Sequence, residues 1–421
     1  MMIRSGIVFL LCLASVLGKG YENFKIYDVI ATNQKQGNVL FELSKQDDYD
    51  FFILPRILNQ TSRVMVPPQK QREFLRILGK NRMDYNLLNA NVGKTIEAEF
   101  AANRKPRTWN SRKLGTERYH SHDDINNYLD VLAEEYPSRV FVKKVGKTYE
   151  NRTMKTITIT NGDGKANKKI IFVDGGMHAR EWISPAAVVY VIEQLVENYE
   201  ENKELLADYN WVIMPVVNAD GYEYTQQSTS NRFWRKTRTP YKGSLNRNCH
   251  GADPNRNFDF HWMEEGASSS PCSETYAGPS GFSEPETRVV RDVLTSIQDR
   301  CKFYLTIHSY GQYLLYPWGW SSDLPETWKD LDEVAMAGYN AILKETGTIY
   351  TVGSSTNVLY VAAGASDDYA FGVNNIPISI TMELPGGGTM GFDPPVSSID
   401  GFVKETWVGI KAMGLKVIEK Y

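Results

Sequence analysis

A histidine and a glutamate three positions apart, His178 and Glu181, lie in the segment DGGMHAREW, which directly follows the apolar run KKIIFV. An imidazole nitrogen and a carboxylate oxygen are both ligands of catalytic zinc, which keeps a further coordination position open for water. The same spacing of histidine and acid also occurs at His120, His250 and His261. Spacing alone therefore leaves all four pairs open, either as metal ligands or as histidines with ordinary structural hydrogen bonds.

Two further candidates, His308 and Glu383, lie at the ends of the apolar runs KFYLTI and PISITM. Ligands of open α/β sheets collect beyond the carboxyl ends of the strands, and His178 with Glu181 follows such a run as well. The other three pairs precede a strand or lie in a polar stretch. Position therefore favours His178, Glu181 and His308 as zinc ligands and leaves Glu383 as a general base. The alternative is a structural hydrogen bond at each of these residues.

These residues are positioned by an alternation of strands and helices that begins near residue 119. Such an alternation predicts a sheet covered by helices on both faces. A helix is expected at 121–136 with Ser121 as its N-cap, and another at 184–199 with Ser184 as its N-cap and Pro185 in the first position. The other elements are expected as strands at 139–146, 153–160, 168–176, 210–217, 302–309 and 377–384 and as helices at 284–299 and 402–421.

The first 20 residues predict a secretory signal peptide. Arg4 precedes an apolar core that runs from Gly6 to Leu17, and small residues follow this core. The alternative, a membrane anchor, requires a longer apolar run, and no later run is long enough. Secretion implies an oxidising compartment, which permits one disulfide among the three cysteines that remain once Cys12 leaves with the signal.

Residues 21 to about 95 predict a small α+β unit ahead of the large domain. We expect strands at 23–31, 39–44, 48–54 and 62–68 and a helix at 69–83. The basic and polar stretch 98–117 has no hydrophobic period and predicts an exposed linker, where a trypsin-like protease can cut. The order of signal, small unit, linker and large domain favours a zymogen, whereas an ordinary loop is the alternative.

The composition limits the classes of binding partner that are expected. The formal net charge of -3 gives no reason to expect a nucleic-acid partner. The hydrophobic content of 42% is ordinary for a soluble globular chain. We expect a monomer with no membrane association.

A series of motifs occurs in a set order along the chain: GGMHAREWIS, NADGYEYT, NRFWRKTR, DPNRNFDFHW, TIHSYGQYLLYPWG, GASDDYA and MELPGGG. With these motifs the sequence resembles the pancreatic carboxypeptidase A/B family of secreted zinc metallocarboxypeptidases, in proenzyme form. The resemblance implies an α/β domain around a mixed, eight-stranded sheet with helices on both faces, preceded by a small α+β prosegment. It implies a signal peptide at 1–20, a prosegment at 21–107 and a catalytic domain at 108–421, with activation by trypsin-like cleavage after Arg107.

The resemblance also implies a zinc exopeptidase that acts on the C-termini of peptides or proteins. One Zn²⁺ ion is held by His178, Glu181 and His308, a His₂Glu set for which carboxypeptidase A is itself a standard example. Glu383 corresponds to the catalytic glutamate and Arg235 to the arginine that stabilises the oxyanion. The residues implied in substrate binding are Arg180, Asn255, Arg256, Ser309, Tyr310 and Tyr360. The family disulfide corresponds to Cys249 and Cys272, which leaves Cys301 as a free, buried thiol.

The residue seven positions after Tyr360 corresponds to the floor of the specificity pocket, and it is Asp367. An aspartate there implies release of C-terminal Lys or Arg, because a buried carboxylate needs a cation. Two departures from the family pattern, Ala365 and Ser355, keep open an A-type preference for aromatic or aliphatic termini. A further alternative is that Asp367 merely caps a helix, a role that Ser366 could also fill.

Two rival functions from other classes are weaker. An inactive secreted binding protein on this fold would be expected to lack Glu383 or a zinc ligand, and all of them are present. A serine hydrolase would need the nucleophile motif G-x-S-x-G, which the segment GPSGFS does not form.

Overall fold

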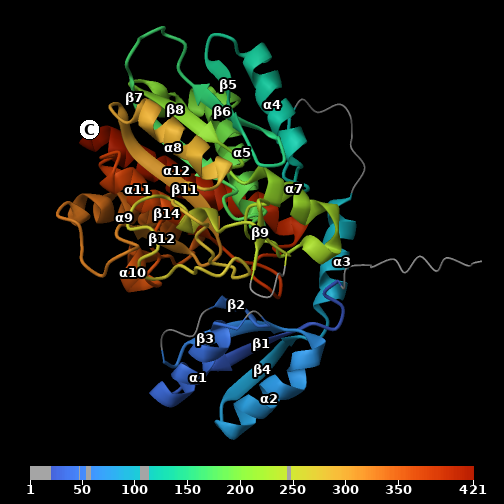
Figure 1. Ribbon diagram of the computed structural model, residues 1–421. Helices are drawn as coiled ribbons and strands as arrows, with labels where there is room; N and C mark the ends of the chain where they lie inside the picture. The colour runs from blue at the N-terminus through green and yellow to red at the C-terminus, as the bar shows by residue number, and fades with distance from the viewer. Residues whose placement is uncertain (1–19, 47, 54–57, 105–112, 244–247) are drawn as a thin grey trace, which may run out of the picture.

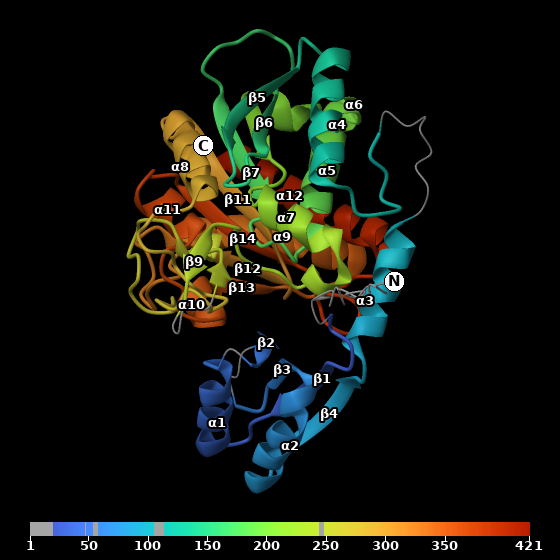
Figure 2. The same ribbon diagram turned by 45° about the vertical axis from the view of Figure 1, so that its right-hand side comes forward.

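The computed structural model describes residues 20–46, 48–53, 58–104, 113–243 and 248–421 of the chain. A small N-terminal unit and a large α/β domain are joined along one side by helix α3 (Val92–Asn103) (Figure 1). Figure 2 shows the N-terminal unit against one end of the large domain, with strand β2 (Asp50–Ile53) nearest to it. Within the described residues, no helix is both long enough and apolar enough to cross a membrane.

The large domain is built on an eight-stranded sheet in the order β13-β12-β14-β11-β7-β8-β6-β5. Its strands are β5 (Val140–Lys147), β6 (Thr153–Ile159), β7 (Lys169–Gly175), β8 (Tyr209–Met214), β11 (Cys301–Ser309), β12 (Tyr313–Tyr316), β13 (Thr351–Ser354) and β14 (Ile378–Leu384). The central strands β14, β11, β7 and β8 are parallel, whereas β12 and β6 pair antiparallel with β14 and β8. The expectation of a mixed, eight-stranded sheet is confirmed.

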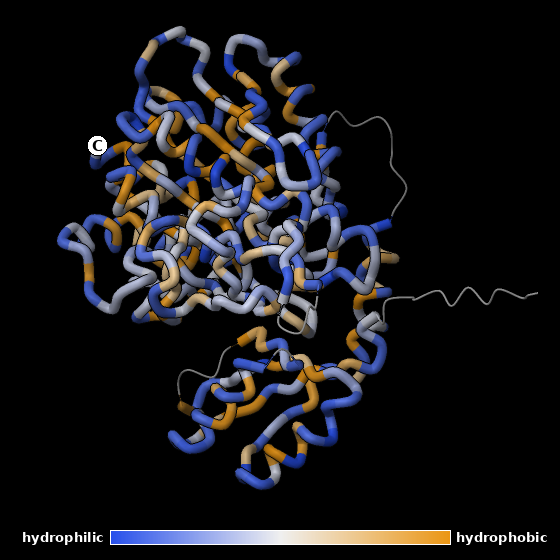
Figure 3. The backbone as a smooth tube through the Cα atoms, in the orientation of Figure 1, coloured by the Kyte–Doolittle hydropathy of each residue, from blue (hydrophilic) through white to orange (hydrophobic). Residues whose placement is uncertain are grey.

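Helices cover both faces of this sheet, as expected. Successive side chains of β7 point to opposite faces. Ile171 and Val173 belong to the core formed with α5, α9 and α12, while Ile170 and Phe172 belong to the core formed with α8 and α11. In Figure 3 the hydrophobic residues follow the interior strands. The helices are α4 (His122–Glu135), α5 (Ile183–Val196), α6 (Tyr199–Asn202), α7 (Ala219–Gln227), α8 (Pro285–Ile297), α9 (Trp328–Thr346), α10 (Ser355–Val358), α11 (Ser366–Gly372) and α12 (Ile399–Lys420).

One of the two expected N-caps is present. The Ser121 side chain accepts a hydrogen bond from the backbone N–H of Asp124, as an N-cap does. Ser184, in contrast, is not an N-cap, because α5 already begins at Ile183.

The hydroxyl of Ser184 instead joins the ends of two strands. It accepts from the backbone N–H of Gly176 at 2.9 Å and donates to the carbonyl of Ile307 at 2.6 Å. Both of these backbone groups lie where the sheet ends, so they need partners from outside the ladder. The serine therefore fixes the turn after β7 against β11, the two strands whose ends carry the histidines.

The N-terminal unit has the expected α+β class with two local corrections. Its sheet has the order β2-β3-β1-β4, with β1 (Lys25–Ile30), β3 (Thr61–Val66) and β4 (Asp84–Asn89), and its helices are α1 (Gln34–Ser44) and α2 (Gln71–Lys80). The strand expected at 39–44 is wrong, because these residues belong to α1. Gln36, Leu40 and Leu43 are buried at helical spacing, and Asn33 caps the helix. The edge strand β4 was not expected, because most of its side chains are exposed.

The linker was predicted at 98–117, and this predicted start lies too early in the chain. Residues 98–103 continue α3, where Phe100 and Glu99 pack against the large domain. The cleavage site expected after Arg107 lies outside the described residues, as does the signal peptide apart from Gly20.

Candidate active site

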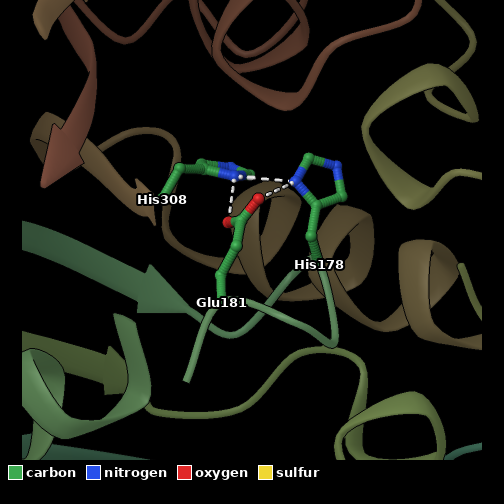
Figure 4. A group of neighbouring side chains, drawn as sticks. All are labelled: His178, Glu181 and His308. Carbon is green, nitrogen blue, oxygen red and sulfur yellow. Dashed lines mark hydrogen bonds and ion pairs between the residues drawn. The ribbon is translucent and has the colours of Figure 1, made fainter. Parts of the chain in front are cut away.

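Four of the predicted site residues come together at the carboxyl ends of neighbouring strands. His178 and Glu181 lie in the turn after β7, and His308 lies near the end of β11. In the parallel register His308 is paired with Glu383 of β14. Figure 4 shows the side chains of His178, Glu181 and His308 pointing toward one another.

The three donors are spaced to hold one cation. The Nδ1 atom of His178 is 2.8 Å from Oε1 of Glu181 and 3.1 Å from Nδ1 of His308. Oε2 of Glu181 is 3.1 Å from the same His308 nitrogen, and one ligand atom of each residue lies within 4.8 Å of the others. Two imidazole nitrogens that face each other across this distance need a proton or a metal between them. Two buried imidazoles and a carboxylate are the donor set of a catalytic zinc site.

A fourth residue, Asp253, orients this centre. Its Oδ1 is 3.0 Å from Nε2 of His178, and its Oδ2 accepts two hydrogen bonds from Arg235 at 3.1 and 2.9 Å. Although burial opposes the charged form, the Arg235 guanidinium and His178 hold the pKa of the Asp253 carboxyl well below its ordinary value. A carboxylate in this position fixes the ring orientation of a histidine ligand.

Asp253 was not among the residues expected at the site. It was set aside as part of the spacing pair with His250, although it opens the motif DPNRNF. The signal that could have found it is the second ring nitrogen of a ligand histidine, which commonly donates to a carboxylate.

Glu383 is paired with His308 across the sheet and lies beside the three donors. Its Oε2 is buried and makes no hydrogen bond within the described part of the chain. Burial, with a smaller effect of the Glu181 carboxylate, raises the pKa of Glu383 to about 7. The Nη1 atom of Arg235 lies 4.0 Å from Oε1 of Glu181.

Comparison with known proteins gives two family matches. Residues 125–409 match the model described as zinc carboxypeptidase, and residues 27–99 match the model described as carboxypeptidase activation peptide. The chain belongs to the zinc carboxypeptidase family. It is a zinc metallocarboxypeptidase made as a proenzyme, and its zinc site is His178, Glu181 and His308.

Relatives of this carboxypeptidase carry both A and B names. It is 47% identical over 303 residues to carboxypeptidase B of Astacus astacus, covering 72% of this chain and 98% of the relative. It is 40% identical to zinc carboxypeptidase A 1 of Drosophila melanogaster, covering 94% of this chain and 92% of the relative. Among solved structures, carboxypeptidase A from Helicoverpa armigera matches with a TM-score of 0.86 at 32% identity, covering 94% of this chain and 98% of that one.

Another buried arginine of the carboxypeptidase, Arg256, is held by backbone carbonyls. Arg256 is buried, with Nε donating to the carbonyl of Gly266 at 3.0 Å and Nη1 to that of Asn255 at 2.7 Å. Its guanidinium lies 5.8 Å from the ring of Tyr360. The amide oxygen of Asn255 accepts from the backbone N–H of Ser366, which ties this group to the start of α11. Planar guanidinium donors suit a carboxylate bidentately.

The first turn of α11 carries two buried carboxylates. Asp367 accepts hydrogen bonds from the Thr381 hydroxyl at 2.9 Å and from the backbone N–H of Asp368 at 3.0 Å. The helix begins after Ala365, and neither Asp367 nor Ser366 caps it, so the capping alternative is wrong. Burial raises the pKa values of both Asp367 and Asp368. Within the described residues, no ion pair joins either carboxylate to a cation.

The activation peptide occupies the rim of the site. Asp50 of β2 accepts from Nη1 of Arg180 at 3.3 Å, and Phe52 lies against Phe392 with ring centroids 5.6 Å apart. Tyr310 also packs against Phe392, with ring centroids 4.9 Å apart. In the described part of the chain, no hydrogen bond or ion pair joins the activation peptide to Glu383, Arg256 or the zinc ligands. The activation peptide therefore contacts this region through Asp50 and Phe52, without described bonds to the zinc ligands.

The remaining predicted residues lie where they support the site. The backbone N–H of Ser309 donates to Glu181, which links the end of β11 to the metal centre. Cys249 and Cys272 form the expected disulfide, and Cys301 is a free, buried cysteine as expected.

Proposed function

We propose that this carboxypeptidase is a secreted zymogen that, once activated, releases C-terminal Lys or Arg. The observation that carries the proposal is Asp367, which is 3% exposed and has no cationic partner within the described residues. A buried charge without a partner is costly, and a cationic substrate side chain would remove that cost. Thr381 and the backbone of Asp368 orient the carboxylate, so it is preorganised for a charged ligand.

An A-type preference is the second candidate. Ala365 stands where the family pattern has glycine, and its methyl group could narrow the pocket for a long side chain. Some relatives are named carboxypeptidase A and others carboxypeptidase B, so names do not decide between the two preferences. A comparison of C-terminal Arg, Lys and Phe as leaving residues separates them, as set out below.

In the proposed mechanism, Glu383 and Arg235 act on the attacking water and on the peptide bond that is cleaved. Zinc, when bound, supplies Lewis-acid polarisation of a carbonyl and makes water a better nucleophile. Glu383 takes a proton from the attacking water and delivers it to the leaving amine. Arg235 donates to the oxygen on which negative charge develops, and Asp253 holds the arginine there.

Binding of the terminal residue completes the proposal. Arg256 and Asn255 receive the free carboxylate, which restricts cleavage to the last peptide bond. Tyr360 closes over the terminal residue of the substrate. The side chain of that terminal residue enters the pocket above Asp367. Arg180, Ser309 and Tyr310 bind upstream residues of the peptide, which is the region that the activation peptide covers through Asp50.

Activation is expected to follow cleavage in the basic linker. Limited trypsin treatment of the zymogen is expected to release an active chain that begins at Thr108, with secondary cuts after Arg104, Lys105 and Arg112. Cleavage frees the activation peptide from its covalent link, so that its contacts with Arg180 and Arg232 become intermolecular and are lost on dilution. N-terminal sequencing of the active product measures the cut. An active chain that starts beyond Tyr119 would contradict this boundary.

A further inference from the structure

A second carboxylate, Asp368, is bonded to a segment far from it in the sequence. It is fully buried, and both of its oxygens lie 2.9 Å from the backbone N–H of Gly319. One of them also accepts from the backbone N–H of Trp320 at 3.0 Å. Because Asp368 is buried away from water, these backbone hydrogen bonds hold its carboxyl group in place. The start of α11 is therefore tied to the Gly319–Trp320 segment, which precedes it by almost 50 residues.

The other side of the Gly319 peptide is tied to the segment that carries Tyr360. The carbonyl of Gly319 accepts from the Thr356 hydroxyl at 2.6 Å and from the backbone N–H of Ala362 at 2.7 Å. These donors flank Tyr360, four residues before it and two residues after it. A further bond joins the N–H of Thr356 to the carbonyl of Trp318 at 3.1 Å. The Gly319–Trp320 peptide is thus bonded to Asp368 through its N–H and to both flanks of the tyrosine through its carbonyl.

The Gly319 position has little space for any other arrangement. A side-chain carbon there would lie 3.3 Å from the carboxylate of Asp368 and 3.3 Å from the carbonyl of Ala362. The Asp368 carboxyl group is bonded to the N–H groups of Gly319 and Trp320, and the N–H of Ala362 is bonded to the carbonyl of Gly319, so neither residue can move freely away. A shift of the helix start at Asp368 would therefore be passed on to Ala362 rather than absorbed between them.

We propose that Asp368 is a positioning residue that couples the pocket for the terminal side chain to the segment of Tyr360. Asp367 and Asp368 are adjacent on α11, so a substrate side chain that fills the pocket fixes the start of this helix. The bonds of Asp368 to the Gly319–Trp320 segment then fix the positions of both flanks of Tyr360. The inference rests on the proposed function in one respect, the role of Tyr360 in closing over the substrate. It does not depend on which terminal residue is preferred.

The test is a double-mutant cycle between Asp368→Asn and Tyr360→Phe. Asparagine keeps an acceptor for the N–H of Gly319 but removes the charge and the second acceptor. We expect Asp368→Asn to lower kcat/KM about tenfold, mainly through KM, in the trypsin-activated enzyme. In the Tyr360→Phe background the same change is expected to lower kcat/KM threefold or less. The tyrosine hydroxyl is already absent there, so a displacement of its segment has less left to remove. The substrate is whichever peptide the wild-type enzyme cleaves fastest, so failure of the basic preference leaves the cycle intact.

Two further variants serve as controls. Thr356→Val removes the hydroxyl bond to the carbonyl of Gly319 and leaves Asp368 in place. It is expected to lower kcat/KM several-fold in the wild-type background. In the Tyr360→Phe background its effect on kcat/KM is expected to be smaller, as for Asp368→Asn. Asp323→Asn removes an exposed aspartate charge just beyond Trp320 and is expected to leave kcat/KM within twofold. Thermal unfolding and zinc content of each zymogen check the fold. If Asp368→Asn does not fold, the Thr356→Val cycle decides.

Additive effects would overturn the proposal, since independent sites multiply their fold-changes. Wild-type kcat/KM in a folded Asp368→Asn enzyme would overturn it as well. An equal loss in Asp323→Asn would assign the effect to net charge near the pocket and not to positioning.

Discussion

Replacing the pocket aspartate with isoleucine is expected to reverse the specificity of the activated enzyme. In the wild type, the cationic side chain of a C-terminal Arg or Lys compensates the buried Asp367 carboxylate, whereas a Phe side chain leaves it buried and unpaired. Asp367→Ile removes the charge and lines the pocket with an apolar side chain. We expect the ratio of kcat/KM for Arg over Phe to fall by several orders of magnitude and to pass below one. Peptides that differ only in their last residue measure it.

The matched control for this change is Asp323→Ala, which removes an exposed aspartate from the loop beyond Trp320. This control is expected to keep the wild-type preference, since an exposed charge is screened by solvent. Asp367 is not a zinc ligand, so the zinc content of Asp367→Ile is expected to be unchanged. That result would show that the metal centre survives the substitution. An Asp367→Ile enzyme that still prefers Arg would place the specificity of the pocket elsewhere.

Glu383→Gln is expected to abolish most of the turnover while keeping the zinc. Glutamine has nearly the shape of glutamate, but it cannot accept a proton from the attacking water or return it to the leaving amine. A general base contributes on the order of 10²–10⁴ in rate, so kcat is expected to fall at least a hundredfold. The zinc ligands His178, Glu181 and His308 are untouched, so metal content is expected to stay near one ion per chain. Turnover numbers and elemental analysis of the same preparation provide both values.

A second glutamate provides the control for the chemistry of this change. Glu264 is exposed and pairs with His261, away from the zinc ligands, so Glu264→Gln is expected to keep wild-type kcat. Near-normal turnover of Glu383→Gln with full zinc content would remove Glu383 from the mechanism.

The large domain could be predicted from sequence because its central strands are long, apolar and buried on both faces. The run KKIIFV has no competing interpretation, since β7 is buried almost throughout. The segment VLFELS was ambiguous, because a short apolar run fits a strand or one face of a helix, and Leu40 and Leu43 are buried on a helix. The strand β4 was missed because an edge strand with exposed side chains carries no apolar alternation.

The metal ligands could be predicted because they lie at strand ends, where the topology of an α/β sheet brings residues together. Asp253 could not be found in this way. It lies in a short turn, and only the folded chain brings its carboxylate to His178. The same holds for Asp368, whose partners are the backbone N–H groups of Gly319 and Trp320. These backbone donors lie almost 50 residues away along the chain, so only the folded structure brings them to Asp368.

Competition among three peptides that share every residue except the last tests the central claim most directly. The peptides end in Arg, Lys or Phe and are mixed in equal amounts with the trypsin-activated wild-type enzyme. Mass spectrometry follows the loss of one residue from each over time. We predict that Arg and Lys are removed first, with the Phe peptide intact until they are consumed, because Asp367 leaves a buried negative charge at the pocket floor. Removal of Phe as fast as Arg would contradict it.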